Sequence, residues 1–384
     1  MKRIYLDHTA TTPIDPRVVE AMQTCFGDVY GNPSSVHWFG QRAREALEEA
    51  RETIAGAIGA ESAELLFTSG GTESDNTALR GAAHAARKRG KTHLVTSKAE
   101  HHAVLDTVGE LVREGFQATV LDVDGVGRVS VSDLESALTP VTCMVSLMHA
   151  NNEVGTLHRL EEITGPVRSR GVLFHTDAVQ TLGKVPVDVD RLGVDLLSVS
   201  AHKLSGPKGV GALYIRKGTD LDPILHGGGQ ERGKRPGTEN VPLVVGFAKA
   251  VELAIASMET ESARLAGLRD RLETKIRERF PDILLNGDPK ERLPHILNVS
   301  FDSEKIALEG EMLVLNMDLE GIAVTSGSAC TSGSMQPSHV LLAMGRDPET
   351  AKATLRFSFG RGNTGEDVEA AVAALEVVVE RMRR

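Results

Sequence analysis

Short apolar runs alternate with segments of helical spacing through the first half of the chain. The runs with the length and composition of buried strands are 65–67, 94–96, 118–121, 143–148, 172–174 and 194–197. The segments with an apolar stripe at helical spacing are 36–58, 77–89, 102–112, 131–138 and 160–170. Strands that alternate with helices predict βαβ crossovers and a mostly parallel sheet covered on both faces. The fold class predicted from the pattern is therefore α/β.

A long helical pattern at 242–280 separates this arrangement from a different one. A strand is predicted before it at 210–215, and further strands follow it at 296–301, 322–324 and 354–359, with helices at 305–319 and from 366. A helix of this length commonly joins two lobes. We therefore expect a large domain of residues 13–258 and a smaller α+β domain formed by residues 1–12 and 259–384.

The composition is ordinary for a soluble globular protein. Of the 384 residues, 41% are apolar and 25% are charged. The formal net charge of -10 argues against non-specific nucleic-acid binding, which depends on Lys and Arg neutralising phosphates. No apolar run approaches the roughly eighteen residues that cross a bilayer, and Asp7 and His8 interrupt the start before a signal core develops. We expect a cytoplasmic protein without a membrane or nucleic-acid partner.

Polar side chains follow several predicted strands, where the carboxyl ends of a parallel sheet meet at one crevice. They supply an imidazole at His101, an amide at Asn152, a carboxylate at Asp177 and an amine at Lys203. Burial would lower the pKa of the Lys203 amine and make it suitable for Schiff-base chemistry. The stretch around Lys203 is equally compatible with a solvated hairpin, because lysines are mostly exposed.

A strand, a glycine turn with hydroxyl side chains and a helix N-terminus come together in the segment 68–76. Backbone N–H groups at Gly71 and Thr72, together with the helix dipole, would favour a bound anion. Ordinary capping at a strand–helix junction explains the same residues equally well. The sequence Gly-x-x-x-x-Gly-Lys-Ser/Thr does not occur, which disfavours a nucleoside triphosphate.

Three cysteines are too few and too scattered for a disulfide framework or a zinc cluster, and we expect no metal site. Cys25 and Cys143 have apolar neighbours, which favours buried, unreactive thiols. Cys330 is surrounded by Ser, Thr, Gly and Ala at 325–334, a composition suited to a mobile loop in which a thiol is accessible and reactive. From composition alone, an incidental exposed cysteine is the alternative.

Ten separated motifs resemble, in the same order, those of the class V aminotransferase group of pyridoxal-phosphate enzymes, and specifically cysteine desulfurases of the NifS/IscS type. The motifs lie at 6–13, 32–35, 68–76, 100–106, 151–155, 177–180, 200–209, 226–237, 326–332 and 356–361. The run Ser-Gly-Ser-Ala-Cys-Thr-Ser at 326–332 is similar to the branch with a long cysteine loop. The resemblance implies a fold type I pyridoxal-phosphate-dependent transferase that forms a homodimer.

The resemblance also implies roles for residues at the cofactor, pyridoxal 5'-phosphate. Lys203 would hold it covalently and move protons, and Asp177 would pair with the ring nitrogen. Gln180 would hydrogen-bond the phenolic oxygen of the ring, and His101 would stack on the ring and act in acid–base steps. The other implied cofactor-binding residues are Gly71, Thr72, Asn152, Ser200, His202 and, from the neighbouring subunit, Thr238.

At the substrate, the resemblance implies that Arg356 clamps the carboxylate of L-cysteine with help from Asn152. Cys330 would attack the substrate sulfur as a thiolate and keep it as a persulfide, leaving L-alanine. Two departures from the family pattern stand out. His102 occupies a position where relatives often have lysine, and the chain stops at Arg384, where many relatives continue into a longer tail.

The shorter tail leaves the sulfur acceptor open between an iron–sulfur scaffold and other carriers. A selenocysteine lyase, or a class V aminotransferase that acts on a small substrate, is the nearest alternative function. The Ser/Gly-rich surroundings of Cys330 argue against a transaminase, which does not require such a cysteine. A non-catalytic scaffold is a second alternative, and the presence of Lys203, Asp177 and Cys330 argues against it.

Overall fold

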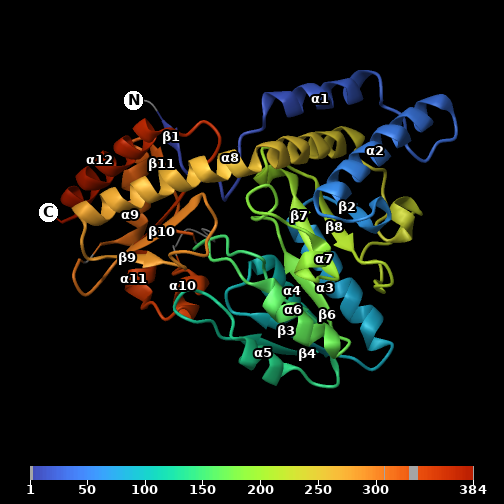
Figure 1. The fold of residues 1–384 in the computed structure, drawn as a ribbon, viewed down its shortest axis with the longest axis horizontal. Helices are drawn as coiled ribbons and strands as arrows, with labels where there is room; N and C mark the ends of the chain where they lie inside the picture. Colours follow the sequence, from blue (N-terminus) through green and yellow to red (C-terminus); the bar gives the residue numbers. More distant parts are fainter. Residues whose placement is uncertain (1–2, 307, 328–335, 384) are drawn as a thin grey trace.

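The computed structural model describes residues 3–306, 308–327 and 336–383. These residues form two lobes joined by one long helix, α8 (Val241–Arg279), which crosses from the large lobe to the smaller one in Figure 1. Both ends of the described chain lie on the smaller lobe. Cys330, the predicted nucleophile, lies outside the described residues.

The large lobe is built on a seven-stranded sheet with the order β2-β8-β7-β6-β5-β3-β4. The strands are β2 (Leu65–Thr68), β3 (His93–Ser97), β4 (Gln117–Leu121), β5 (Thr142–Ser146), β6 (Leu173–Asp177), β7 (Leu196–Ser200) and β8 (Gly211–Ile215). β3, β4, β5, β6 and β7 run parallel, whereas β8 is antiparallel to both of its neighbours, β2 and β7. The prediction of a mostly parallel α/β sheet is confirmed.

Successive residues of each strand point to opposite faces of the sheet and enter two separate cores. Leu94 belongs to the core with α3 and α4, and its neighbour Val95 belongs to the core on the other face. The helices of this lobe are α1 (Pro16–Gly27), α2 (Trp38–Ala57), α3 (Gly71–Arg87), α4 (His102–Arg113), α5 (Val131–Ala137), α6 (Leu160–Ser169) and α7 (Val189–Leu192). Short 3₁₀ turns occur at Ser62–Glu64, Ala201–Lys203 and Gln230–Gly233.

The smaller lobe combines two short sheets with four helices. Its strands are β1 (Ile4–Tyr5), β9 (Ile283–Asn286), β10 (Ile296–Phe301), β11 (Ile322–Ala323) and β12 (Thr354–Ser358). Its helices are α9 (Gly310–Leu319), α10 (His339–Ala343), α11 (Pro348–Lys352) and α12 (Gly365–Met382). β9, β10 and β12 form an antiparallel sheet, and β1 pairs in parallel with β11. The first strand of the chain, β1, is thus paired with β11, which precedes β12 in the sequence.

α8 contributes to the cores of both lobes. Phe247 and Val251 are buried with the large sheet, whereas Leu272 and Ile276 are buried with β10 and α12. The change of partner along α8 supports a boundary near residue 258, although the domain limits stay a prediction.

By length and composition, α8 is also the one helix in the described ranges that is apolar enough to cross a membrane. This segment contains no long uninterrupted apolar run, because Lys249 and Glu252 interrupt it, but its mean hydropathy over 18 residues stays high. The first half of α8 packs against α1 and α2.

The structure contains elements that the pattern does not predict, namely β1, α1, α7, β9, α10 and α11, and it shortens one predicted helix. No helix was predicted at 16–27, yet Asp15 caps α1 and Val18, Met22 and Cys25 bury one face of it. The helix predicted at 305–319 begins only at Gly310. The prediction that Cys25 and Cys143 are buried is confirmed.

Candidate active site

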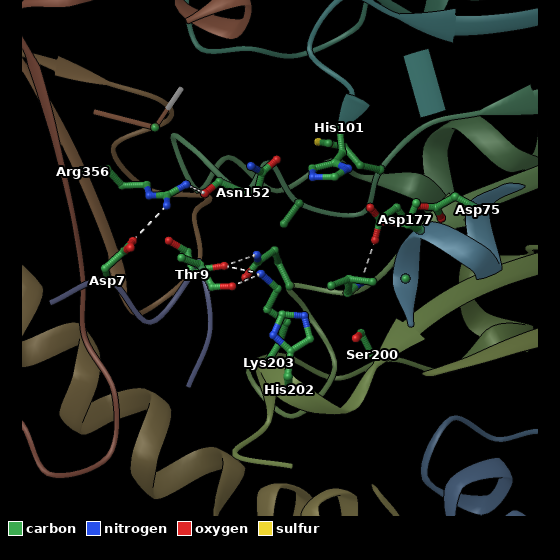
Figure 2. Close-up of a pocket in the computed structure, with 18 of the residues that line it drawn as sticks. Asp7, Thr9, Asp75, His101, Asn152, Asp177, Ser200, His202, Lys203 and Arg356 are labelled. Atoms are coloured by element: carbon green, nitrogen blue, oxygen red, sulfur yellow. Dashed lines mark hydrogen bonds and ion pairs between the residues drawn. The ribbon is translucent and has the colours of Figure 1, made fainter. Parts of the chain in front are cut away.

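A cavity of about 420 Å³ lies where the carboxyl ends of the parallel strands face the smaller lobe. Its lining combines residues that follow β3, β5, β6 and β7 with the start of α3, the N-terminal segment and β12 (Figure 2). The predicted site residues that line it are Gly71, Thr72, His101, Asn152, Asp177, Gln180, Ser200, His202, Lys203 and Arg356. Residues as far apart as 71 and 356 in the sequence therefore share one site.

Lys203 ends the 3₁₀ turn after β7 and reaches into the cavity. Its Nζ donates hydrogen bonds to the backbone carbonyl oxygens of Thr9 at 2.5 Å and Ala10 at 2.8 Å. Burial and, secondarily, the charge of Arg356 lower the pKa of Lys203 to about 8. This arrangement excludes the solvated-hairpin alternative, because the side chain lines the cavity and its amine donates to two backbone carbonyl oxygens. The amine is half-buried and can lose its proton near neutral pH.

Asp177 ends β6 and faces the cavity below His101 in the view of Figure 2. Burial raises the pKa of Asp177 although the Val179 N–H donates to its Oδ1 at 2.8 Å. No lysine or arginine forms an ion pair with Asp177 in the part of the chain that the structure describes. A cationic ring nitrogen at this position would supply the missing partner charge.

His101 caps the N-terminus of α4 at the mouth of the cavity. Its Nδ1 accepts a hydrogen bond from the Ala103 N–H at 3.1 Å, so the neutral ring carries its proton on Nε2. The residue is solvent-accessible, yet partial loss of water around the ring lowers its pKa, and the charge of Asp177 opposes that shift. A neutral imidazole with a free Nε2–H therefore borders the cavity.

The N-terminus of α3 forms a cup for an anion at one side of the cavity. Gly70 precedes α3 with φ of 154°, a conformation that other residues rarely adopt, and provides no side-chain cap. The Oγ of Ser200 is buried without a hydrogen-bond partner among the described residues. The pKa of His202 is lowered to about 4, chiefly by burial, so its ring is neutral and donates or accepts as a neutral group.

The free N–H groups of α3 and the unpartnered Ser200 hydroxyl fit a phosphate, and a carboxylate and an amine lie across the same cavity. These residues fit pyridoxal phosphate: the phosphate at the α3 cup, the ring nitrogen at Asp177 and the aldehyde carbon at Lys203. Groups of three or more metal-ligating side chains are not found in the described ranges.

Arg356 comes from the smaller lobe and closes the cavity opposite α3. Its guanidinium donates to Asp7 Oδ1 and to the carbonyl oxygen of Asn152, both at 3.0 Å, while its buried Nε has no partner in the described chain. The side chain is only 6% exposed. A carboxylate entering the cavity would meet a desolvated, oriented guanidinium, and Asp7 would compete with it for the same group.

Gln180 lies 8% exposed beside the N-terminal segment and donates from Nε2 to the Thr9 carbonyl oxygen at 3.1 Å. The same oxygen accepts from Lys203. Thr238 is exposed and does not line the cavity, and Cys330 falls in the undescribed residues 328–335. The roles assigned to these residues stay predictions.

Sequence reasoning missed Asp7, the carbonyl groups of Thr9 and Ala10, and two buried carboxylates. Burial raises the pKa of Asp75 well above its usual range and that of Glu100 to about 8, and the charge of Asp177 raises both further. Both residues lie within motifs that resemble the family, at 68–76 and 100–106, so the resemblance could have identified them as site residues. The burial of Asp75 depends on the packing of α3 on the sheet, and that of Glu100 on the turn between β3 and α4, which no local pattern encodes.

Comparison with known proteins gives consistent matches over the whole chain. The family model described as aminotransferase class-V matches residues 4–371. "Cysteine desulfurase IscS" of Dictyoglomus turgidum is 51% identical over 384 residues, which cover 100% of this chain and 96% of that protein. "Cysteine desulfurase IscS" of Methanosarcina thermophila is 48% identical over 382 residues, covering 100% of this chain and 93% of that protein.

Solved structures give the same result. A chain described as a NifS-like protein superimposes with a TM-score of 0.90 at 39% identity, and the match covers 99% of both chains. A structure described as SspA in complex with cysteine has a TM-score of 0.81 at 36% identity, covering 92% of this chain and 98% of that one. The matches extend over both lobes.

Proposed function

The chain belongs to the class-V aminotransferase family, and from that premise we propose that it is a pyridoxal-phosphate-dependent cysteine desulfurase. It converts L-cysteine to L-alanine and passes the sulfur to Cys330 as a persulfide. The observation that carries the proposal is the meeting of Lys203, Asp177, His101 and Arg356 around one cavity in a chain that is 51% identical to a cysteine desulfurase.

Different side chains of the cavity would carry out different parts of the reaction. When bound, pyridoxal phosphate supplies an electron-accepting ring that stabilises negative charge at the substrate Cα. The Asp177 carboxylate would pair with the ring nitrogen, and the start of α3, which has no side-chain cap, would hold the phosphate. Lys203, with its pKa near 8, accepts and returns a proton at Nζ. Arg356 orients the substrate carboxylate from a position that excludes water.

The sulfur transfer conserves atoms and electrons. The Cβ–S bond of L-cysteine breaks, a S–S bond forms at the Cys330 thiolate, and the former Cβ takes up a proton. L-cysteine and a thiol thus become L-alanine and a persulfide. His101 lines the cavity and is a proton-carrying side chain there, whereas His102 lines a neighbouring pocket.

An assay of L-alanine and sulfide in the presence of L-cysteine and a thiol reductant tests this function. We expect both products in equal amounts. Release of alanine from L-selenocysteine alone would instead assign a selenocysteine lyase, and consumption of a keto acid without sulfide would assign an aminotransferase. Absence of a yellow cofactor in the purified protein would leave only the scaffold alternative.

The lowered pKa of Lys203 predicts the pH dependence of cofactor attachment. Only the free amine reacts with an aldehyde, so the attachment rate of the cofactor-free protein should rise about tenfold per pH unit below 8 and level off above it. An unperturbed lysine would keep gaining rate up to about pH 10.4. Stopped-flow absorbance with pyridoxal phosphate measures the rate, with a simple alkylamine in the same buffers as the control. A rate that still rises steeply between about pH 8.5 and 10 contradicts the prediction.

We also propose that the protein acts as a homodimer whose contact includes an aromatic patch around the α1–α2 connection. Large apolar side chains are exposed there: Phe26, Tyr30, Val36, Trp38 and Phe39 are between 44% and 87% exposed. The rings of Trp38 and Phe39 lie 5.0 Å apart, edge to face. Such a patch on a soluble surface is typical of a protein contact. In the dimer, Thr238 would reach the phosphate of the neighbouring subunit.

Replacing Trp38 with Glu should weaken dimerisation at least about 30-fold, because a charge replaces a large aromatic contact at the centre of the patch. Light scattering after size-exclusion chromatography measures the change. Val377→Glu on α12 is the matched control, since Val377 is 45% exposed but lies away from the patch. If Trp38→Glu stays as dimeric as the control, the patch is not the contact.

The downstream partner is proposed on chemical grounds alone. A protein-bound persulfide is delivered to a thiol or metal-binding acceptor, and we propose an acceptor protein such as an iron–sulfur scaffold in the cytoplasm. The net charge of -10 is consistent with a protein partner rather than a nucleic acid.

A further inference from the structure

A second cavity of about 220 Å³ lies between the two lobes, on the other side of the Lys203 turn from the active site. Its walls come from Ser205 after that turn, Lys184 before α7, Ser257 on α8 and His295 before β10, together with Arg361 after β12. The volume is below the roughly 300–1,000 Å³ of pockets for drug-sized molecules, which favours a small ion.

Lys184 is the first unusual group in this cavity. Burial lowers its pKa, and its Nζ has no hydrogen bond or ion pair to any described residue. Glu261 is the acidic side chain that acts on it electrostatically, but the carboxylate of Glu261 already binds the guanidinium of Arg264 through two hydrogen bonds, at 2.6 and 2.8 Å. Lys184 therefore places a donor-rich cation in the cavity that forms no ion pair with a described residue, although Glu261 lines the same cavity.

His295 is the second unusual group. It is 2% exposed, and its Nδ1 has no hydrogen-bond partner in the described parts of the chain. Burial is the main cause that lowers the pKa of His295, and the nearby Lys184, His8 and two arginines lower it further. Positive charge from Lys184 thus lies near this ring, which favours an anion.

The acidic groups of the cavity do not cancel this charge. Asp15 is 4% exposed at its side chain and already forms ion pairs with both Arg17 and Arg361. The Asp15 carboxylate is therefore shared by two guanidinium groups, and no carboxylate in the described residues forms an ion pair with Lys184. An anion bound beside Lys184 would supply the ion-pair partner that the described residues do not give it.

We propose that this interlobe cavity binds a small oxyanion, with the Lys184 ammonium and the ring N–H of His295 as donors. The proposed ligand is a negatively charged group with several hydrogen-bond acceptors, of the size of phosphate, sulfate or a carboxylate. Lys184 belongs to the large lobe and His295 to the smaller one, so the ion bridges the lobes. Ser205 also lines the cavity, two residues from Lys203, and its carbonyl oxygen accepts from the Asp15 N–H at 2.9 Å.

The test uses the protein with its cofactor bound, so that the phosphate cup of the active site is filled. Calorimetric titration with inorganic phosphate, sulfate and acetate at constant ionic strength, balanced with chloride, should show saturable binding of at least one of them. The anion that binds identifies the preferred oxyanion. The same anion should raise the thermal midpoint in proportion to its binding.

Lys184→Gln should weaken that binding at least about tenfold, and Lys249→Gln should leave it unchanged. Lys249 lies on α8, where it pairs with Glu252 at 2.9 Å, and it does not line the cavity. Should Lys184→Gln fail to fold, Ser257→Asp adds a carboxylate at the exposed edge of the cavity and should weaken binding by a similar factor. Absence of saturable binding by all three anions overturns the proposal, as does equal binding by the Lys184→Gln and Lys249→Gln proteins.

Discussion

Replacing Lys203 with alanine is expected to lower sulfide release from L-cysteine by at least about 10³-fold. The amine is the group that we propose attaches the cofactor, and burial brings its pKa to about 8, so its loss would remove both the attachment point and a base. The visible absorbance of the covalently attached cofactor should disappear, although the α3 cup and Asp177 would still bind free pyridoxal phosphate weakly. Absorbance spectra and a sulfide assay measure the two effects.

The matched control for that experiment is Lys217→Ala. Lys217 follows β8 and is exposed, and its side chain is not part of the cavity. The control should keep both the colour and the turnover. A Lys203→Ala protein that retains a reduction-sensitive covalent cofactor, or more than about a tenth of the turnover, would show that another amine holds the cofactor.

Replacing Cys330 with serine should separate cofactor binding from sulfur transfer. A hydroxyl is far less acidic than a thiol and cannot form the S–S bond, so sulfide release should fall at least about 10²-fold while the yellow cofactor stays in place. L-cysteine should still perturb the absorbance spectrum, because Arg356 and Lys203 are intact. Spectral titration and sulfide release measure the two properties.

Cys25→Ala is the control for this substitution. Cys25 is 3% exposed on α1, and burial raises the pKa of its thiol, which makes it a poor nucleophile. Cys143 is also a poor candidate for the nucleophile, since burial raises the pKa of its thiol to about 11. Undiminished turnover in Cys330→Ser, with loss of turnover in Cys25→Ala, would move the sulfur-accepting role away from Cys330.

Much of the site could be predicted because it lies at strand ends. Asp177 ends β6 and Lys203 follows β7 directly, and adjacent parallel strands bring such residues together by geometry alone. The sequence pattern of strands and the residues that follow them therefore predicts that the Lys203 amine and the Asp177 carboxylate share one crevice. The family resemblance was needed to assign them to a cofactor, since the same pattern fits a solvated hairpin.

Other features depend on contacts between distant segments. The carbonyl groups of Thr9 and Ala10 hold Lys203 across more than 190 residues, and Asp7 pairs with Arg356 across 349. No periodicity or propensity encodes such pairs, because they arise only when the smaller lobe closes on the large sheet. The buried carboxylate of Asp75 was missed for the same reason, since its depth is set by the packing of α3.

The pairing of β1 with β11 also fixes the order in which a newly made chain can complete this site. β1 leaves the ribosome early, but its partner strand follows roughly 300 residues later, which at about 5–20 residues per second is on the order of 15–60 seconds of synthesis. Until then the N-terminal segment has only its contacts with the large lobe, such as the Thr12 hydroxyl on the His202 carbonyl oxygen and Gln180 Nε2 on that of Thr9. The full set of contacts that positions Lys203 and Arg356 is therefore complete only after β11 and β12 have been made.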